Sequence, residues 1–245
     1  MAPDPRSPTQ HSTVTREQWL VARRALLQEE KEFTRLRDAL SRRRRELPWE
    51  PVEQSYVFDG PDGPESLSDL FAGARQLVVY HFMFNPADEA GCPHCSFWAD
   101  HYDGMLPHLR QRDVSFVVIS RAPREKLAAF QRRMGWKFKW LSSGRNEFNY
   151  DFGASFTPAE VKSGKPLYNV GTLPPGVQDR EGLSVFCKDA DGRIFRTYSC
   201  YARGIDMFNG TYQILDLVPK GRDEDPEATQ SWVRHHDRYG SGQGR

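Results

Sequence analysis

The sequence predicts an α/β protein in which a mixed sheet is flanked by helices and preceded by a long N-terminal helix. Apolar runs at 76–84 and 113–120 each precede a helical pattern, which is the order of parallel strands joined by right-handed crossovers. Two further apolar stretches, at 183–187 and 193–201, flank a polar turn that ends in glycine and predict an antiparallel hairpin. Residues 15–47 repeat apolar side chains every seven positions, as a long amphipathic helix does.

Length and composition fit one domain with extensions. At 245 residues the chain is long enough for one sizeable α/β domain and short for two of average size. The hydrophobic content of 38% and the net charge of +1 fit a polar surface without a global field for nucleic acid or membrane. We therefore expect a disordered start at 1–14, the helix at 15–47, a domain at 50–220 and a polar tail at 221–245.

The N-terminus and the cysteines bear on the cellular compartment. Residues 1–15 lack the apolar core of a secretory signal, and no stretch reaches the roughly 18 apolar residues of a membrane span. We therefore expect a cytoplasmic protein, in which four cysteines indicate redox or metal chemistry rather than a structural disulfide framework. Cys187 and Cys200 stand roughly 15 Å apart along the predicted hairpin, which argues against a bridge between them.

The long helix carries two features that a partner could recognise. Its apolar stripe recurs at Trp19, Leu26, Phe33 and Leu40, and must be buried either against the chain's own domain or against a second copy in a homodimer. Its end, Arg42-Arg43-Arg44-Arg45, could bind an acidic partner or nucleic acid. The favoured interpretation of that end is a solvated turn whose cations suit the helix macrodipole.

Further elements are expected around the first two apolar runs. A strand, a turn and a short helical turn cover 56–71, ahead of the first run. A helix from the cysteine motif to Leu109 follows the first run, and a helix from Pro123 to Gly135 follows the second. The inward positions of these two helices are Trp98, Tyr102, Met105, Leu106, Leu109, Leu127, Phe130 and Met134.

The second half of the chain is less regular. Residues 136–140 alternate aromatic side chains with lysines, which predicts a strand with one buried face. The connection at 142–182 is long for a compact domain and contains one helix start, Thr157-Pro158-Ala159-Glu160. A last helix is expected at 205–217.

The chemistry centres on Gly91-Cys92-Pro93-His94-Cys95, where the first strand gives way to its helix. Residues three apart on a helix place their Cα atoms roughly 5 to 6 Å apart, which permits a reversible disulfide. Pro93 suits the first helical turn because its missing N–H has no partner there, and Cys92 at the cap lies beside unpaired backbone donors. The thiolate of Cys92 should therefore be favoured, and the less exposed Cys95 would act as the resolving thiol.

His94 adds a hydrogen-bond donor, and a cation when it is protonated, beside both sulfurs. Stabilising the thiolate makes the disulfide easier to reduce, so the Pro-His pair should bias the couple toward oxidising power. We expect Cys92 to form a mixed disulfide with the substrate and Cys95 to release it. No cofactor or metal is expected to take part.

Other interpretations of these side chains compete. The C-x-x-C could be half of a zinc site, although no second ligand pair is present, or a pair of inert buried thiols. His94, His101 and His108 recur every seven positions, which is too far apart to share one ion. His81 is interpreted as a histidine of the core, and His235-His236-Asp237 as part of a solvated tail rather than a metal site.

Several blocks of the sequence resemble known families. Within residues 56–201, FDGPDGPESLSDLFAGARQLVVYHFMFNP running into GCPHC resembles the start of the peroxiredoxin-like branch of the thioredoxin superfamily. More closely, GCPHCSFWAD, GWKFKWLSSGRNEFNYDFGASF, GLSVFCKDADGRIFRTYSCYARG and YQILDLVPKGRDE resemble a family of bacterial proteins of uncharacterised function, described as predicted dithiol-disulfide oxidoreductases. The resemblance covers most of the chain and implies a thioredoxin-like fold with a redox-active dithiol.

The chain departs from these families in two places. Pro86 lies six residues before Cys92, and no hydroxyl residue takes the place of the peroxiredoxin Thr or Ser. No proline directly precedes the strand that begins near Leu183, where thioredoxins carry one. The leading hypothesis is a thiol-disulfide oxidoreductase acting on a protein or small-molecule thiol or disulfide, and the alternatives are a thiol peroxidase and a non-catalytic binding protein of the same fold.

Overall fold

A computed structural model describes residues 12–164, 167–169, 171–172 and 178–240. Most of the expected disordered start, the last five residues and part of the 142–182 connection, with Pro174-Pro175, lie outside the described residues. The chain divides into two compact units, one of residues 1–48 with 213–223 and one of residues 49–212 with 224–245. No helix among the described residues combines the length and the hydropathy of a membrane span.

The first unit contains helix α1, Arg16–Arg45, which confirms the predicted long helix. Thr15 caps its first turn, because its side chain accepts the backbone N–H of Gln18 while the Gln18 side chain accepts the N–H of Thr15. The helix contains no buried residue, and Phe33 of the apolar stripe is 66% exposed. Pairing of this stripe with a second copy stays a prediction.

The second unit is built on a mixed sheet of eight strands in the order β1-β10-β9-β4-β5-β6-β2-β3. Strand β4 lies at its centre, parallel to β5 and antiparallel to β9, and β6 extends the parallel side. The strands are β1 Glu50–Pro51, β2 Val57–Gly60, β3 Gly63–Ser66, β4 Gln76–His81, β5 Val114–Ser120, β6 Lys139–Ser142, β9 Gly182–Lys188 and β10 Ile194–Tyr201. A separate small ladder pairs β7 Leu167–Tyr168 with β8 Gly171–Thr172.

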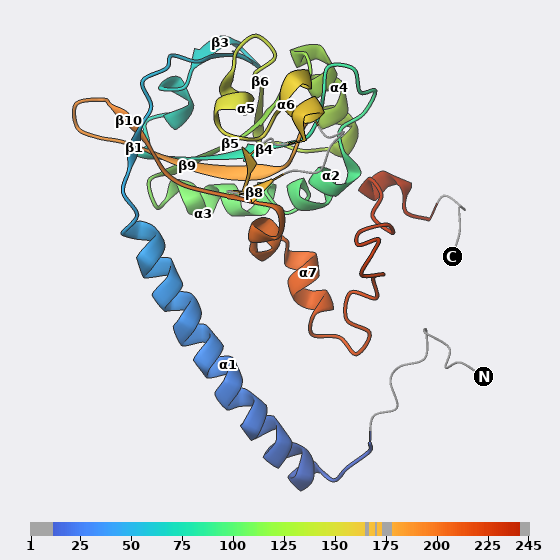
Figure 1. The fold of residues 1–245 in the computed structure, drawn as a ribbon. Helices are drawn as coiled ribbons and strands as arrows, with labels where there is room; N and C mark the ends of the chain where they lie inside the picture. Colours follow the sequence, from blue (N-terminus) through green and yellow to red (C-terminus); the bar gives the residue numbers. More distant parts are fainter. Residues whose placement is uncertain (1–11, 165–166, 170, 173–177, 241–245) are drawn as a thin grey trace. The chain divides into compact units, whose positions relative to one another are not determined.

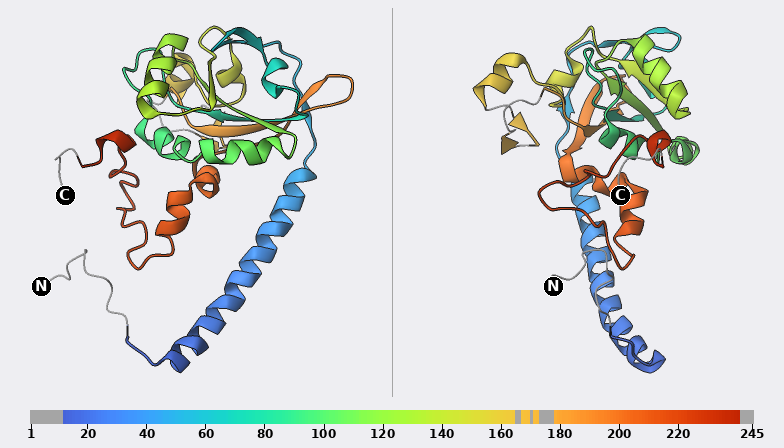
Figure 2. Two further views of the ribbon diagram at one scale, coloured as in Figure 1. Left: turned by 180° about the vertical axis from the view of Figure 1, so that it is seen from behind. Right: turned by 90° about the vertical axis from the view of Figure 1, so that its right-hand side faces the viewer.

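Helices cover both faces of this sheet (Figure 1). Helices α2, Pro93–Ala99, α3, Leu106–Arg110, and α4, Arg124–Met134, lie on one face, whereas α5, Phe148–Asp151, lies on the other, as a second view shows (Figure 2). The chain order β4-α2-β5-α4, followed by the antiparallel pair β9-β10 beside β4, defines a thioredoxin-like fold. The predicted fold class is therefore confirmed.

The core lies against both faces of the central strands. Leu77 and Val79 of β4 pack with Phe148 of α5 on one face. Tyr80 points to the opposite face, where its ring centroid lies 5.1 Å from that of Tyr102. This alternation along β4 explains why its sequence is apolar without a break, since both faces are covered.

Several predicted elements are confirmed with small changes in their bounds. Helix α4 follows Pro123 and ends at Gly135, whose φ of 70° is the left-handed conformation that glycine adopts without steric cost. Helix α6, Pro158–Ser163, begins with the predicted capping box at Thr157. In the hairpin, Cys187 lies opposite Phe195 and Cys200 opposite Leu183, which confirms that the two cysteines are not bridged.

The helix predicted to run from the cysteine motif to Leu109 is wrong in its length. It ends at Ala99, and a 3-10 turn, Asp103–Met105, separates it from α3. The N–H groups of His101 and Tyr102 bond three residues back, which tightens the chain out of the α-helix. Pro107, which has no N–H, begins the next helix in its first turn.

Two other bounds also differ from the prediction. The strand expected at 136–140 begins only at Lys139, because the Asp103 carboxylate accepts the backbone N–H groups of Lys137 and Phe138 at 2.9 Å each. The helix expected at 205–217 is a 3-10 helix, Ala202–Phe208, followed by α7, Gly210–Leu215.

Candidate redox site

The dithiol lies at the end of β4, where the backbone of Met83 holds both ends of the cysteine motif. The Met83 carbonyl accepts the N–H of Cys92 at 3.1 Å, and the Met83 N–H points to the sulfur of Cys95 at 3.4 Å. The strand thereby fixes the start of α2 relative to the sheet. The structure thus places the motif at a strand-to-helix junction.

Gly91 occupies a position where any side chain would force neighbouring rings to move. A Cβ atom there would lie 2.8 Å from the ring of Phe82 and 2.9 Å from the ring of Phe130, both shorter than real contacts allow. Its carbonyl lies 2.8 Å from Nε2 of His235. The peptide that leads into Cys92 is therefore enclosed on its side-chain face and hydrogen-bonded at its oxygen.

Cys92 is the N-cap of α2 and is half-buried. Hydrogen bonds from Cys95, followed by the hydrogen bond and charge of His94, lower the pKa of Cys92 to about 5 against the opposing effect of burial. The carbonyl of Cys92 accepts the N–H of Ser96 at 2.9 Å, which starts the helix. At neutral pH the Cys92 sulfur is therefore mainly a thiolate.

Cys95 lies one turn further along and is 1% exposed. Burial, together with the hydrogen bond and the charge of Cys92, raises the pKa of the Cys95 thiol well above its ordinary value. All four cysteines of the chain are free thiols in this structure. Two sulfurs in one helical turn thus differ sharply in protonation, with the accessible one ionised.

His94 and Pro93 fill the two positions between the cysteines. Pro93 is the first residue of the helix, as predicted. The His94 residue is exposed, and its interaction with the Cys92 sulfur is the main cause of its raised pKa. The four predicted site residues therefore lie together in one helical turn, in which His94 is exposed and Cys95 is buried.

A carboxylate that sequence reasoning did not single out also lies near the dithiol. Glu181 precedes β9, beside the end of β4, because Gly182 pairs with His81. Burial raises the pKa of Glu181, and the charge of Cys92 raises it further, so the two groups lie close enough to influence each other. The hydroxyl of Tyr168 donates to the Glu181 carbonyl at 2.9 Å and holds this turn in place.

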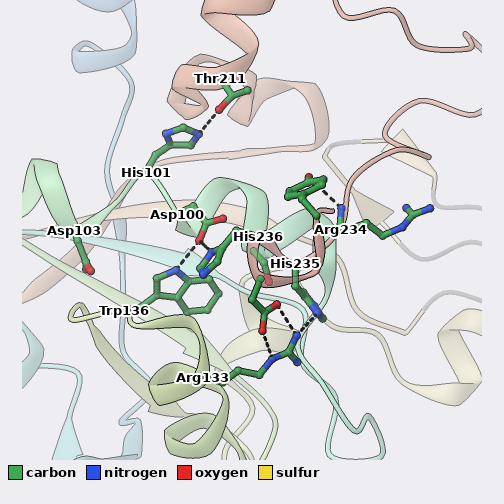
Figure 3. A network of polar contacts seen from close by, with 12 residues as sticks. Asp100, His101, Asp103, Arg133, Trp136, Thr211, Arg234, His235 and His236 are labelled. Atoms are coloured by element: carbon green, nitrogen blue, oxygen red, sulfur yellow. Dashed lines mark hydrogen bonds and ion pairs between the residues drawn. The ribbon is translucent and has the colours of Figure 1, made fainter. Parts of the chain in front are cut away.

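The C-terminal segment, residues 224–239, also reaches the site, which corrects the interpretation of His235-His236-Asp237 as a solvated tail. His235 is 5% exposed and lies between Arg133 and the Gly91 carbonyl (Figure 3). Arg133 also forms two hydrogen bonds of 2.8 Å with the carboxylate of Asp237. His236 lies 2.7 Å from Asp100 at the end of α2.

The remaining candidate histidines have separate surroundings. His81 is fully buried in the core, and its Nε2 lies 2.9 Å from the hydroxyl of Ser184, which confirms it as a core histidine. His101 lies 3.1 Å from the hydroxyl of Thr211. Among the described residues, no group of three or more His, Cys, Asp or Glu side chains is arranged to hold a metal ion.

The sequence from residue 8 to residue 239 matches a family described as "Bacterial protein of unknown function (DUF899)". The match extends over most of the chain, so the protein belongs to this family. Comparison with curated proteins found no similar sequence.

Solved structures include similar chains of redox proteins. Peroxidoxin BcpB from Mycobacterium tuberculosis is 19% identical with a TM-score of 0.44, over 68% of this chain and 96% of that one. A cysteine-to-serine variant of PrxQ from Xylella fastidiosa is 12% identical with a TM-score of 0.44, over 68% and 94%. A protein assigned as thiol:disulfide interchange protein DsbE from Chlorobium tepidum is 14% identical with a TM-score of 0.40, over 71% and 99%. None of these similarities is high enough to assign an activity.

Proposed function

We propose that the protein is a dithiol-disulfide oxidoreductase in which Cys92 exchanges with the substrate and Cys95 resolves the mixed disulfide. The observation that carries this proposal is the opposite protonation of two thiols in one helical turn. Cys92 is accessible and has a pKa of about 5, whereas Cys95 is buried and has a raised pKa. An exchange reaction needs this combination, because the thiolate attacks and the second thiol must wait for the intermediate.

The reaction balances without a cofactor. The Cys92 thiolate attacks one sulfur of a substrate disulfide, a Cys92-substrate bond forms, and the leaving sulfur departs with the electron pair and takes a proton. Cys95 then loses its proton and attacks the Cys92 sulfur, which releases the second substrate thiol and leaves a Cys92-Cys95 disulfide. The substrate is reduced by two electrons and the protein is oxidised by two, and the same steps run in reverse.

The first step prepares the second. The charge of Cys92 is one of the causes that hold Cys95 protonated in the reduced protein. That charge disappears when the Cys92 sulfur enters the mixed disulfide, so the pKa of Cys95 falls and its thiolate becomes easier to form. Glu181 lies in the same environment, since its charge also acts on Cys95, and is placed to influence that proton.

The low pKa of Cys92 also bears on the direction of electron flow. A stabilised thiolate favours the reduced dithiol over the disulfide, so the oxidised form should act as an oxidant toward substrate thiols. We therefore place the protein toward the oxidising end of dithiol couples. Its substrate in this proposal is a protein or small-molecule thiol.

The proposal is tested by trapping and by a redox titration. Cys95→Ser keeps a hydroxyl beside Cys92 but has no sulfur to attack the mixed disulfide. Incubation of this variant with an oxidised model protein should therefore accumulate a mixed disulfide at Cys92, which mass spectrometry detects. Titration of the wild-type pair against glutathione buffers should give an oxidising potential. Failure of the pair to oxidise in any buffer would overturn the proposal in favour of a binding protein, and hydroperoxide consumption that requires Cys92 without thiol exchange would favour a peroxidase.

A further inference from the structure

The peptide that joins Gly91 to Cys92 is held at both of its polar groups. The N–H of Cys92 donates to the carbonyl of Met83 at 3.1 Å. The Gly91 carbonyl lies 2.8 Å from Nε2 of His235, and no other described residue forms a hydrogen bond with it. Gly91 is buried, and a buried carbonyl without a partner is costly. His235 therefore satisfies the backbone oxygen that directly precedes the dithiol.

Helix α4 holds the His235 ring against this peptide. The ring of Phe130 meets the imidazole edge to face, with the centroids 5.2 Å apart, and also closes over the α-carbon of Gly91. The guanidinium of Arg133, one turn further along α4, lies 5.3 Å from the Phe130 centroid and reaches Nδ1 of His235 at 3.2 Å (Figure 3). The imidazole is thus fixed by packing on one ring and by polar contacts at both of its nitrogens.

The two polar contacts of His235 determine which ring nitrogen carries the proton. A guanidinium only donates, so Nδ1, which faces Arg133, is the unprotonated acceptor. A carbonyl only accepts, so Nε2, which faces Gly91, carries the proton. Burial lowers the pKa of His235 against the opposing effect of its bond to Gly91, and the charge of Arg133 lowers it further. A neutral ring protonated at Nε2 satisfies both contacts, whereas a charged ring would turn an N–H toward a cation.

We propose that His235 is a positioning residue for the resolving step, because its ring holds the Gly91–Cys92 peptide where Cys95 can reach the Cys92 sulfur. This inference rests on the proposed function, in which Cys95 attacks the mixed disulfide at Cys92. In a trans peptide the C=O and N–H point in opposite directions, so His235 and Met83 clamp this peptide from its two sides. The N–H of Met83 also points to the sulfur of Cys95 at 3.4 Å, so both thiols are referred to the same backbone.

This clamp matters most when the two sulfurs of the protein must meet. The Cys95 thiolate forms a bond to the Cys92 sulfur, the bond from that sulfur to the substrate breaks, and the substrate sulfur leaves with the electron pair. A disulfide of about 2 Å with a narrow range of dihedral angles forms only if the Cys92 backbone is in place. Attack of Cys92 on a substrate has no such constraint, because the substrate approaches from solvent and adjusts to the sulfur. His235 neither gains nor loses a proton in either step.

Reaction of the reduced protein with dithiobis(nitrobenzoic acid) separates the two steps. Attack by Cys92 releases one coloured thiolate, and attack by Cys95 on the resulting mixed disulfide releases the second, so stopped-flow absorbance resolves two phases. All proteins in this experiment carry Cys187→Ser, so that this half-buried thiol adds no signal.

Two substitutions of His235 test its role in this assay. His235→Phe keeps an aromatic ring without either nitrogen, and should slow the second phase about tenfold or more at pH 7. The first phase should change less than about twofold, because Cys92 stays ionised at this pH. His235→Gln carries an amide N–H that can donate to the Gly91 carbonyl, and should return the second phase to within about threefold of the wild-type rate.

The next residue provides the matched control for general loosening of the C-terminal segment. His236 bonds Asp100 rather than Gly91, at 2.7 Å. His236→Phe should therefore leave the second phase at the wild-type rate. The inference would be overturned by an unchanged second phase in H235F, by equal slowing in H236F, or by H235Q as slow as H235F.

A measurement on the unaltered side chain covers the case in which H235F does not fold. Nitrogen NMR of histidine-labelled wild-type protein, with the His235 signals identified by their loss in H235Q, should show a neutral ring protonated at Nε2 at pH 7. A proton on Nδ1, or a charged ring, would contradict the inference. Failure of the proposed function has a different signature, since wild-type protein without a second phase would reject Cys95 as the resolving thiol, and this role of His235 with it.

Discussion

Two places in the second unit carry a pair of cysteines, and their chemistry differs because their backbones differ. Cys92 begins a helix, receives hydrogen bonds from Cys95 and His94, and has a pKa lowered to about 5. Cys187 is the penultimate residue of strand β9, where burial raises the pKa of its thiol. No hydrogen bond is among the causes that shift the pKa of Cys187, so its thiol stays protonated where that of Cys92 ionises.

The two places also differ in what surrounds their glycines. Gly91 is enclosed by two aromatic rings, whereas Gly192 in the hairpin turn has no atom within 4 Å of the position of a Cβ and a φ of 83°. One glycine is required by neighbouring side chains and the other by its own backbone conformation.

The largest effect is expected from the cysteines themselves. Cys92→Ser should reduce thiol-disulfide exchange with a model protein to the uncatalysed rate, because the only ionised sulfur of the dithiol is lost. Cys187→Ser is the matched control in the hairpin and should retain the wild-type rate. Full exchange in the Cys92→Ser protein would remove the distinction between the two cysteine pairs.

The second largest effect is expected in the pH dependence of alkylation, which should differ between Cys92 and Cys187. As pH falls, Cys92 should stay reactive until about pH 5, because its thiolate is protonated only there. Cys187 should react only as pH rises above the ordinary range for a thiol. Peptide mapping of the reduced wild-type protein at pH 7 should show Cys92 alkylated more than about tenfold faster, and similar rates at both cysteines would contradict the comparison.

Substituting the two glycines should separate packing from backbone strain. Gly91→Ala should lower the free energy of unfolding by about 1 to 3 kcal/mol, because Phe82 and Phe130 must move, and should also slow exchange. Gly192→Ala should cost about 1 to 2 kcal/mol through its positive φ and leave exchange unchanged. Denaturant unfolding and the exchange assay measure both, and slower exchange in the Gly192→Ala protein would contradict the assignment.

The smallest effect is expected at the anchor of the C-terminal segment. The Arg133 guanidinium lowers the pKa of Asp237, so this carboxylate stabilises the fold at neutral pH and the contribution is lost as pH falls through its folded-state pKa. Asp237→Asn should cost less than about 1 kcal/mol at pH 7, because the pair is partly exposed. The difference from wild type should vanish in acid, and a difference that grows there would contradict this sign.

The sheet and the dithiol turn could be predicted because their signals are local. The unbroken apolar run of β4 and the Pro123-to-Gly135 pattern of α4 each occupy one stretch of sequence. The position of Cys92 at a helix cap followed from the same kind of signal, a strand pattern that changes to a helix pattern. Both the cap and the first-turn proline lie where the spacing placed them.

What could not be predicted depends on contacts between distant residues. The late start of β6 follows from the Asp103 carboxylate, which lies more than thirty residues earlier in the chain. The approach of His235 to Gly91 joins residues 144 positions apart. A polar segment such as 224–239 carries no periodic signal, so its packing against α2 is visible only in three dimensions.

The shortness of α2 has a consequence for how the dithiol responds to its medium. With only seven residues, the helix adds little long-range potential at its cap, so the thiolate of Cys92 depends on Cys95 and His94 in direct contact. Contacts at hydrogen-bond distance are screened much less by dissolved ions than charges separated by a Debye length. The ionisation of Cys92 should therefore be nearly independent of ionic strength, so that dilute buffer and concentrated salt leave the same sulfur ready to react.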